Sequence, residues 1–150
     1  MSELSDLYQE VILDHSRKPH NFGALPGANR KAEGYNPLCG DQVTIFLDFE
    51  NNKIRDIHFE GKGCAISKSS ASVMTDIVKG KTKEEAAALF DKFRHLVTDA
   101  KPEELEETDK LAVFSGVSQF PTRVKCAILP WHTLRSALED KHDKITTESL

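Results

Sequence analysis

Three cysteines are the residues of this chain whose types and settings could support metal or sulfur chemistry. Cys39 follows a proline-led turn in NPLCGD (36–41), Cys64 follows Gly-Lys-Gly, and Cys126 follows Arg-Val-Lys near the start of an expected helix. An isolated cysteine is most often a small buried apolar residue. Each of these three instead lies at the end of an expected element, where metal ligands and nucleophiles are commonly found. Their number is odd, which disfavours a disulfide framework and favours free or metal-bound thiols in a reducing compartment.

Two expected strands place two of these cysteines together. Apolar residues alternate along 43–49, the turn ENNK (50–53) follows, and a second alternating run covers 54–61. This pattern predicts an antiparallel hairpin, in which the start of the first strand lies beside the end of the second. We therefore expect Cys39, Asp41 and Cys64 to be neighbours in space.

The other elements follow from helical periodicity and from capping signals. The sequence predicts a short edge strand over 31–36, a turn-containing segment over 111–121 and a frayed polar tail over 141–150. It also predicts helices over 4–16, from Cys64 to Gly80, over 82–97 behind a capping box, and from Pro121 onward. Residues 99–110 carry six acids against two lysines and are expected to form a solvated loop with a short helix.

The composition restricts the class of protein. A chain of 150 residues is long enough for one domain, so we assign 1–150 to a single domain. The net charge of −4 argues against nucleic-acid binding, which relies on clustered Lys and Arg. No apolar run approaches the roughly 18 residues of a membrane span, and the first residues do not resemble a secretory signal. We therefore expect a cytoplasmic protein with no membrane partner.

Three thiolates and the carboxylate of Asp41 would complete a four-coordinate site. Sulfur donors favour zinc or iron–sulfur chemistry, and zinc also accepts an aspartate oxygen. The spacing differs from the strong CxxC…CxxC pattern, and Asp41 could equally be a turn aspartate that binds local N–H groups. None of the six histidines lies within two residues of a cysteine, and none is expected to be a ligand. Lys125 could lower the pKa of the Cys126 thiol or could be an ordinary solvated lysine.

Three motifs, NPLCGD (36–41), GKGCAISKSSAS (61–72) and RVKCAILPW (123–131), together resemble the IscU/NifU-like family of iron–sulfur scaffold proteins. LYQEVILDHSRKPHNFG near the N-terminus is similar to the opening helix and loop of that family. Two departures point to its SufU branch. Lys125 stands where the IscU branch has a histidine, and the stretch between Cys64 and Cys126 is long, with the extra helical and acidic segment around 81–110.

The resemblance implies an α+β fold, with a small antiparallel sheet of about three strands and helices packed mainly on one face. It implies Zn²⁺ bound by Cys39, Asp41, Cys64 and Cys126. It further implies that Cys39 is the catalytic residue that receives persulfide sulfur from a cysteine desulfurase of the SufS type. The expected activity is that of a sulfurtransferase of the SUF system, which would supply downstream iron–sulfur scaffold proteins.

Two other functions stay open. The same ligands could assemble a [2Fe–2S] cluster on a scaffold protein, with iron or the cluster in place of zinc. A protein of another class, a zinc-stabilised adaptor without chemistry, would unfold when zinc is removed and would never carry a persulfide.

Overall fold

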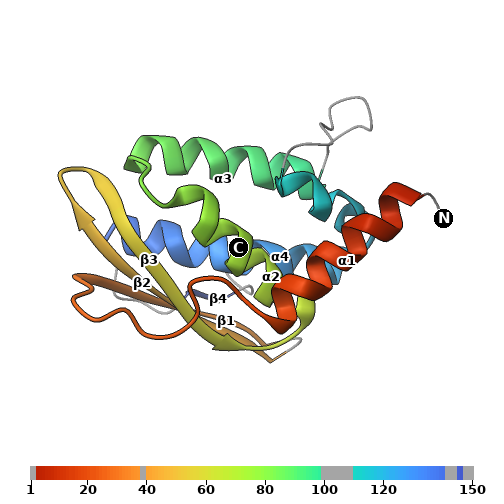
Figure 1. Ribbon diagram of the computed structural model, residues 1–150, viewed down its shortest axis with the longest axis horizontal. Coiled ribbons are helices and arrows are strands. Elements are labelled where there is room, and N and C mark those ends of the chain that lie inside the picture. The colour runs from red at the N-terminus through yellow and green to blue at the C-terminus, as the bar shows by residue number, and fades with distance from the viewer. Residues whose placement is uncertain (1–2, 38–39, 99–109, 141–144, 147–150) are drawn as a thin grey trace.

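The computed structural model describes residues 3–37, 40–98, 110–140 and 145–146. In chain order, the elements are α1 (Glu3–Arg17), β1 (Arg30–Asn36), β2 (Asp41–Glu50), β3 (Lys53–Lys62), α2 (Ala65–Val78), α3 (Lys83–Thr98), the 3₁₀ helix η2 (Lys110–Gln119), α4 (Pro121–Leu138) and β4 (Ile145–Thr146). The predicted α+β fold is confirmed, because β1, β2 and β3 form an antiparallel sheet and the helices lie on one side of it (Figure 1). Cys39 and the acidic run up to Asp109 lie outside the described residues. No described helix combines the length and the apolar character that crossing a membrane requires.

The predicted hairpin is confirmed, and its turn has a simple cause. Asn51 and Asn52 both have positive φ, 53° and 62°, which is the conformation that a two-residue type I′ turn requires. Asparagine tolerates this conformation better than most residues do. The turn pairs Glu50 with Lys53, and an irregularity between Asp48 and Phe49 then shifts the register by one residue. As a result Gln42, near the start of β2, pairs with Lys62, at the end of β3.

Two predictions about the margins of the sheet were wrong. The strand at 31–36 exists as β1, but it is not an edge strand, because the sheet order is β3-β2-β1-β4. Ile145 and Thr146 pair in parallel with Gly34 and Tyr35, so part of the tail that was expected to fray forms β4. A two-residue strand has too short a pattern to be recognised before its partner is known.

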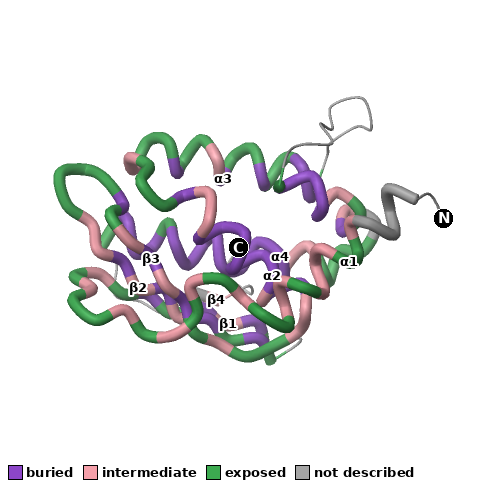
Figure 2. The backbone as a smooth tube through the Cα atoms, viewed as in Figure 1, coloured by how far each residue is buried: buried purple, intermediate pink, exposed green. Residues whose placement is uncertain are grey.

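The helices form two layers above the sheet. Helices α2 and α4 pack against the strands, α3 packs on α4 and η2, and the most buried segments follow α2, α4 and the strands that face them (Figure 2). Small serines let α2 approach its neighbours closely, and the Ser70 hydroxyl donates to the Ala127 carbonyl of α4 at 2.5 Å. Residues 111–121 were expected to form a turn-containing segment, but most of them belong to a 3₁₀ run over Lys110–Gln119 that is longer than usual.

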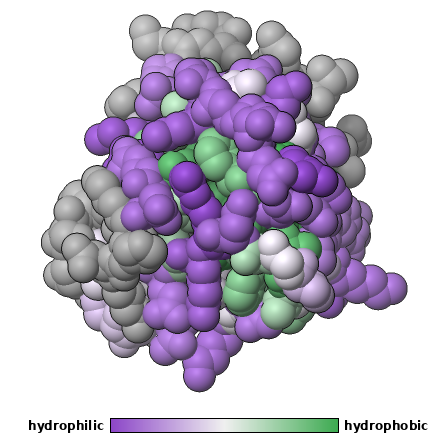
Figure 3. All heavy atoms as spheres, turned by 90° about the vertical axis from the view of Figure 1, so that its left-hand side faces the viewer, coloured by the Kyte–Doolittle hydropathy of each residue, from purple (hydrophilic) through white to green (hydrophobic). Residues whose placement is uncertain are grey.

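The start of α3 and the end of α4 leave a groove of about 220 Å³ between them. Its walls are mostly apolar and include Phe90, Trp131 and Leu134, while Lys83 and Arg135 also line it. Figure 3 faces this end of the molecule and shows apolar surface framed by polar side chains. Neither Cys64 nor Cys126, the two cysteines among the described residues, lines this groove, so it is separate from the site that these two residues form.

Gly34 sets the distance between β1 and α4. A Cβ atom at this position would overlap the Thr133 hydroxyl and would press on Leu129 and Val43. We predict that Gly34→Ala destabilises the protein by about 1–3 kcal/mol, the usual cost of overpacking a filled core. The free energy of unfolding in urea measures this change.

Gly116→Ala is the matched control, because nothing lies within 4 Å of the Cβ that it would add. It should change stability by no more than about 0.5 kcal/mol. Equal stability of the two variants would contradict the close approach of β1 and α4.

Candidate metal centre

The ends of three elements converge on one small cluster of potential metal ligands. Asp41 is the first residue of β2, Cys64 is the N-cap of α2 directly after β3, and Cys126 lies in the second turn of α4. One ligand atom from each residue lies within 4.8 Å of the others. The predicted proximity of Asp41 and Cys64 is confirmed, and Cys126 joins them. The placement of Cys39, outside the described residues, stays a prediction.

Asp41 is held by the backbone of Cys64. Its Oδ1 accepts a hydrogen bond from the Cys64 N–H at 2.8 Å, while Oδ2 lies 3.7 Å from Cys64 Sγ. The aspartate is fully buried, and a buried carboxylate is tolerated only when it is paired or hydrogen-bonded. Both roles considered for Asp41, a turn aspartate and a metal ligand, are compatible with these contacts. One oxygen binds a local N–H, and the other faces the Cys64 thiol.

Gly63 makes this contact possible. Its φ is +153°, and a Cβ atom there would overlap Oδ1 of Asp41. Residues with side chains rarely adopt this conformation, and none would leave room for the carboxylate. Gly63, the second glycine of Gly-Lys-Gly-Cys, is thus required for two reasons: its backbone conformation and the space that the Asp41 carboxylate occupies.

The Cys64 thiol has unusual acidity because of its position. Hydrogen bonding with Cys126 is the main cause that lowers its pKa, to about 7, and the Ser67 N–H, 3.5 Å from the sulfur, lowers it further. Burial and the negative charge of Asp41 oppose this shift. The N-terminus of α2 also favours a thiolate at the N-cap. At neutral pH, Cys64 is thus a thiol that readily loses its proton to become a ligand or a nucleophile.

Cys126 is buried, with 2% of its surface exposed, yet it is more than an apolar core residue. The side-chain amide of Asn36 donates to its sulfur at 3.4 Å, and Asn36 is itself fully buried. Asn36 was not predicted to be part of the site, although this residue opens the motif NPLCGD. Its signal was weak, since an asparagine before a proline is equally typical of a turn.

The donor set fits a divalent metal of the zinc or iron type. Two thiols are soft donors that select such ions, and zinc also accepts an aspartate oxygen. Ionised Asp41 and ionised Cys64 repel each other, and a cation between them would remove this repulsion. The cluster of described ligand atoms contains no imidazole.

His132 shows why a histidine near the core need not be a ligand. The ring packs edge-on against Phe90 at a centroid distance of 4.9 Å and is 8% exposed. Burial is the main cause that lowers its pKa to about 4, and the nearby positive charge of Arg135 acts in the same direction. His132 is thus a packed residue at the edge of the core.

The fold and this cluster define a small α+β protein with a sulfur-rich site at the joined ends of two strands and two helices. The model of the NifU-like N-terminal domain matches residues 7–147, and the chain belongs to that family. The iron–sulfur cluster assembly scaffold protein IscU of Streptococcus pyogenes serotype M1 is 42% identical over 139 residues, which cover 93% of this chain and 87% of that protein.

The names of two further relatives refer to the SUF system of iron–sulfur cluster assembly or to its protein SufU. The zinc-dependent sulfurtransferase SufU of Bacillus subtilis (strain 168) is 34% identical over 91% of this chain and 92% of its own length. A crystal structure from Fervidobacterium islandicum AW-1, titled as a putative iron–sulfur cluster assembly scaffold protein for the SUF system, is 39% identical with a TM-score of 0.75. The similarity covers 86% of this chain and 94% of that one. The resemblance to the IscU/NifU-like family is thus confirmed.

The acidity of Cys64 can be tested in the metal-free protein. We predict that the rate at which iodoacetamide alkylates Cys64 rises with pH with a midpoint near 7, because the thiolate is the reactive form. In Cys126→Ala the main hydrogen-bond partner is lost, so the midpoint should move upward. Peptide mapping by mass spectrometry separates Cys64 from the other two cysteines. A midpoint near the ordinary value of about 8.5 in both proteins would contradict this account.

Proposed function

We propose that this protein takes part in iron–sulfur cluster assembly as a zinc-dependent acceptor of sulfur from a cysteine desulfurase of the SufS type. The observation that carries the proposal is the convergence of Asp41, Cys64 and Cys126 within 4.8 Å. Support comes from the relative named as a zinc-dependent sulfurtransferase, which matches 91% of this chain. The desulfurase and downstream scaffold proteins would be the partners, in the cytoplasm.

Cys39 is proposed as the fourth ligand beside Asp41, Cys64 and Cys126. It stands two residues before Asp41, in the connection between the end of β1 and the start of β2, and these two strand ends are paired (Asn36 with Asp41). Bound zinc would keep the thiols ionised and would protect them from oxidation. The residues of the chain would hold the metal and present one sulfur to the partner.

Contacts in the site favour Cys39 over the other two cysteines as the sulfur acceptor. Cys126 is buried and bonded to Asn36, and Cys64 caps α2, so moving either sulfur would break contacts of the fold. Cys39 is followed by Gly40, whose φ of +73° suits a tight turn.

The proposed transfer follows thiol–disulfide exchange. The Cys39 thiolate attacks the outer sulfur of the desulfurase persulfide, and a new S–S bond forms on Cys39. The S–S bond of the desulfurase breaks, and its electron pair leaves with the desulfurase thiolate. The reaction needs no other oxidant or reductant.

The second candidate is a scaffold on which a [2Fe–2S] cluster is built as cargo. The observation in its favour is the 42% identical relative, which is named as a scaffold protein. Anaerobic reconstitution distinguishes the two functions, since a scaffold passes a coloured cluster to an apo acceptor and a sulfur acceptor does not. The third reading, a zinc-stabilised adaptor, requires that no cysteine ever carries a persulfide.

The test is the turnover of a matched cysteine desulfurase. We predict that the protein as purified stimulates turnover, that metal removal abolishes the stimulation, and that zinc restores it. Cys39→Ala should reduce turnover to that of the desulfurase alone, because the acceptor sulfur is gone.

His95→Asn is the control, because it changes an exposed residue of α3 and leaves every proposed ligand in place. It should stimulate as the unchanged protein does. Sulfur transfer to Cys39→Ala at the unchanged rate would refute the role of Cys39. Weak stimulation in every metal state would favour the scaffold function instead.

A further inference from the structure

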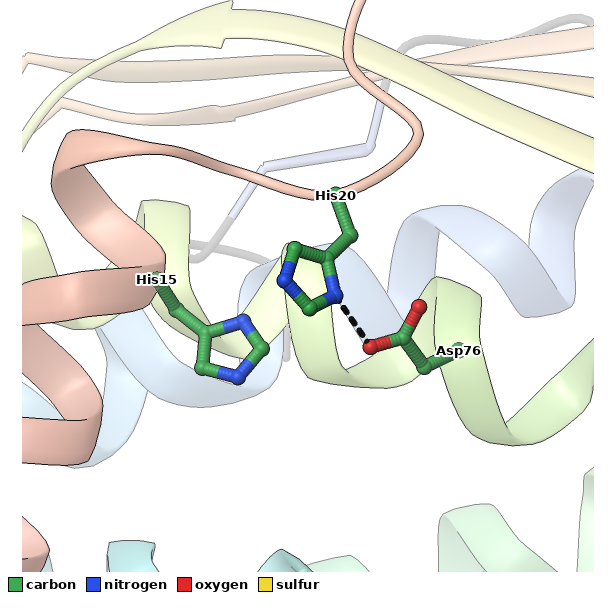
Figure 4. Close-up of side chains that lie close together, drawn as sticks. All are labelled: His15, His20 and Asp76. Carbon is green, nitrogen blue, oxygen red and sulfur yellow. Dashed lines mark hydrogen bonds and ion pairs between the residues drawn. The ribbon is translucent and has the colours of Figure 1, made fainter.

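A second group of potential metal ligands lies away from the cysteines. His15 on α1, His20 in the loop that follows, and Asp76 near the end of α2 each place one ligand atom within 4.8 Å of the others (Figure 4). Asp76 follows Cys64 by twelve residues on the same helix (76 − 64), which is roughly 18 Å along its axis. We propose that His15, His20 and Asp76 form a second binding site, for a divalent transition-metal ion.

Ser72 on α2 holds the two histidines in place. Its hydroxyl oxygen lies 2.7 Å from His15 Nδ1 and accepts the backbone N–H of His20 at 2.8 Å. Ser72 is fully buried, so these contacts are shielded from water. A hydroxyl can donate to a bare ring nitrogen or accept from a protonated one, so it supports a neutral imidazole in either tautomer. Metal-binding imidazoles are commonly oriented by such a second partner.

The distances suit a metal with little movement. His20 Nδ1 lies 2.6 Å from Asp76 Oδ2, and the rings of His15 and His20 are 4.5 Å apart between centroids. Two ligands of one tetrahedral zinc, each bonded at about 2.0–2.1 Å, are separated by about 3.3 Å. A shift of less than about 1 Å would therefore open the His20–Asp76 pair around an ion. Asn21 also donates to Asp76 Oδ1, at 3.3 Å, and so helps to fix the carboxylate.

The charge of the cluster also suits a divalent cation. Burial is the main cause that lowers the pKa of His15, and the nearby charge of His20 adds to this, so the neutral ring that a metal needs is favoured. The Asp76 carboxylate supplies negative charge beside the two imidazole rings, which favours a divalent cation. When a divalent ion binds, the contact between His20 Nδ1 and Asp76 Oδ2 would be replaced by a bond from each of these atoms to the metal.

The types of ligand in this group indicate which metal ions it would bind. Two imidazoles with one carboxylate and open positions are typical of catalytic zinc and of non-haem ferrous iron, whereas thiolates are absent from this group. The side chain of His20 is 53% exposed, so an ion could enter and leave from solvent. The site is therefore suited to an exchangeable borderline ion such as Zn²⁺ or Fe²⁺.

Equilibrium dialysis of the metal-free protein against Zn²⁺ tests this proposal. The unchanged protein should bind one more zinc than His20→Asn or Asp76→Asn does. Cys64→Ser should keep the zinc at the histidine site. Ser72→Ala should weaken the second site by about tenfold or more, as the loss of an orienting partner does elsewhere. His95→Asn, which removes an exposed imidazole outside the group, is the control and should bind as the unchanged protein does.

Imidazole NMR spectra of the unchanged protein give a second readout that does not depend on how the variants fold. Of the six histidines, only His15 and His20 should shift as the second zinc binds. Shifts at other histidines instead of these two would overturn the proposal. Equal zinc binding by His20→Asn and the unchanged protein, with equal melting temperatures, would overturn it as well.

Discussion

The hydrogen bond from the Cys64 N–H to the Asp41 carboxylate is the contact on which the cysteine site depends. It joins the start of β2 to Cys64, the N-cap of α2, which lies two residues after the end of β3. The absence of a side chain at Gly63 leaves room for it. The Asn51–Asn52 turn and the register shift between Asp48 and Phe49 together bring these positions side by side. Without the carboxylate, the buried N–H would lose its partner, at a cost of about 1–3 kcal/mol. The same interaction thus ties the start of β2 to the start of α2 and places Asp41 Oδ2 close to Cys64 Sγ.

Helix α2 connects the two groups of potential metal ligands that this structure presents. Its N-cap supplies Cys64, and its later turns supply Ser72 and Asp76. The two groups differ in the ions that they favour, because one contains a buried and a half-buried thiol and the other contains partly exposed imidazoles. A rigid helix between them keeps the two sites apart while fixing both.

The sequence was sufficient for features that depend on local patterns. The hairpin, the helix after Cys64 and the capping box of α3 followed from alternation, periodicity and capping signals, and Thr82 and Glu85 make the two expected reciprocal bonds. The pairing of Asp41 with Cys64 followed from antiparallel geometry. Features formed by distant contacts were missed: the donation from Asn36 to Cys126 spans 90 positions, and the His20–Asp76 pair spans 56. β4 was missed because two residues gain strand structure only through β1.

X-ray absorption at the zinc edge, on protein loaded with one equivalent of Zn²⁺, tests the central claim most directly. The account predicts three sulfur ligands at about 2.3 Å and one oxygen at about 2.0–2.2 Å. Asp41→Ala should alter the oxygen shell while sulfur remains. A shell of nitrogen and oxygen alone would contradict the account, because the tightest zinc would then lie outside the cysteine cluster.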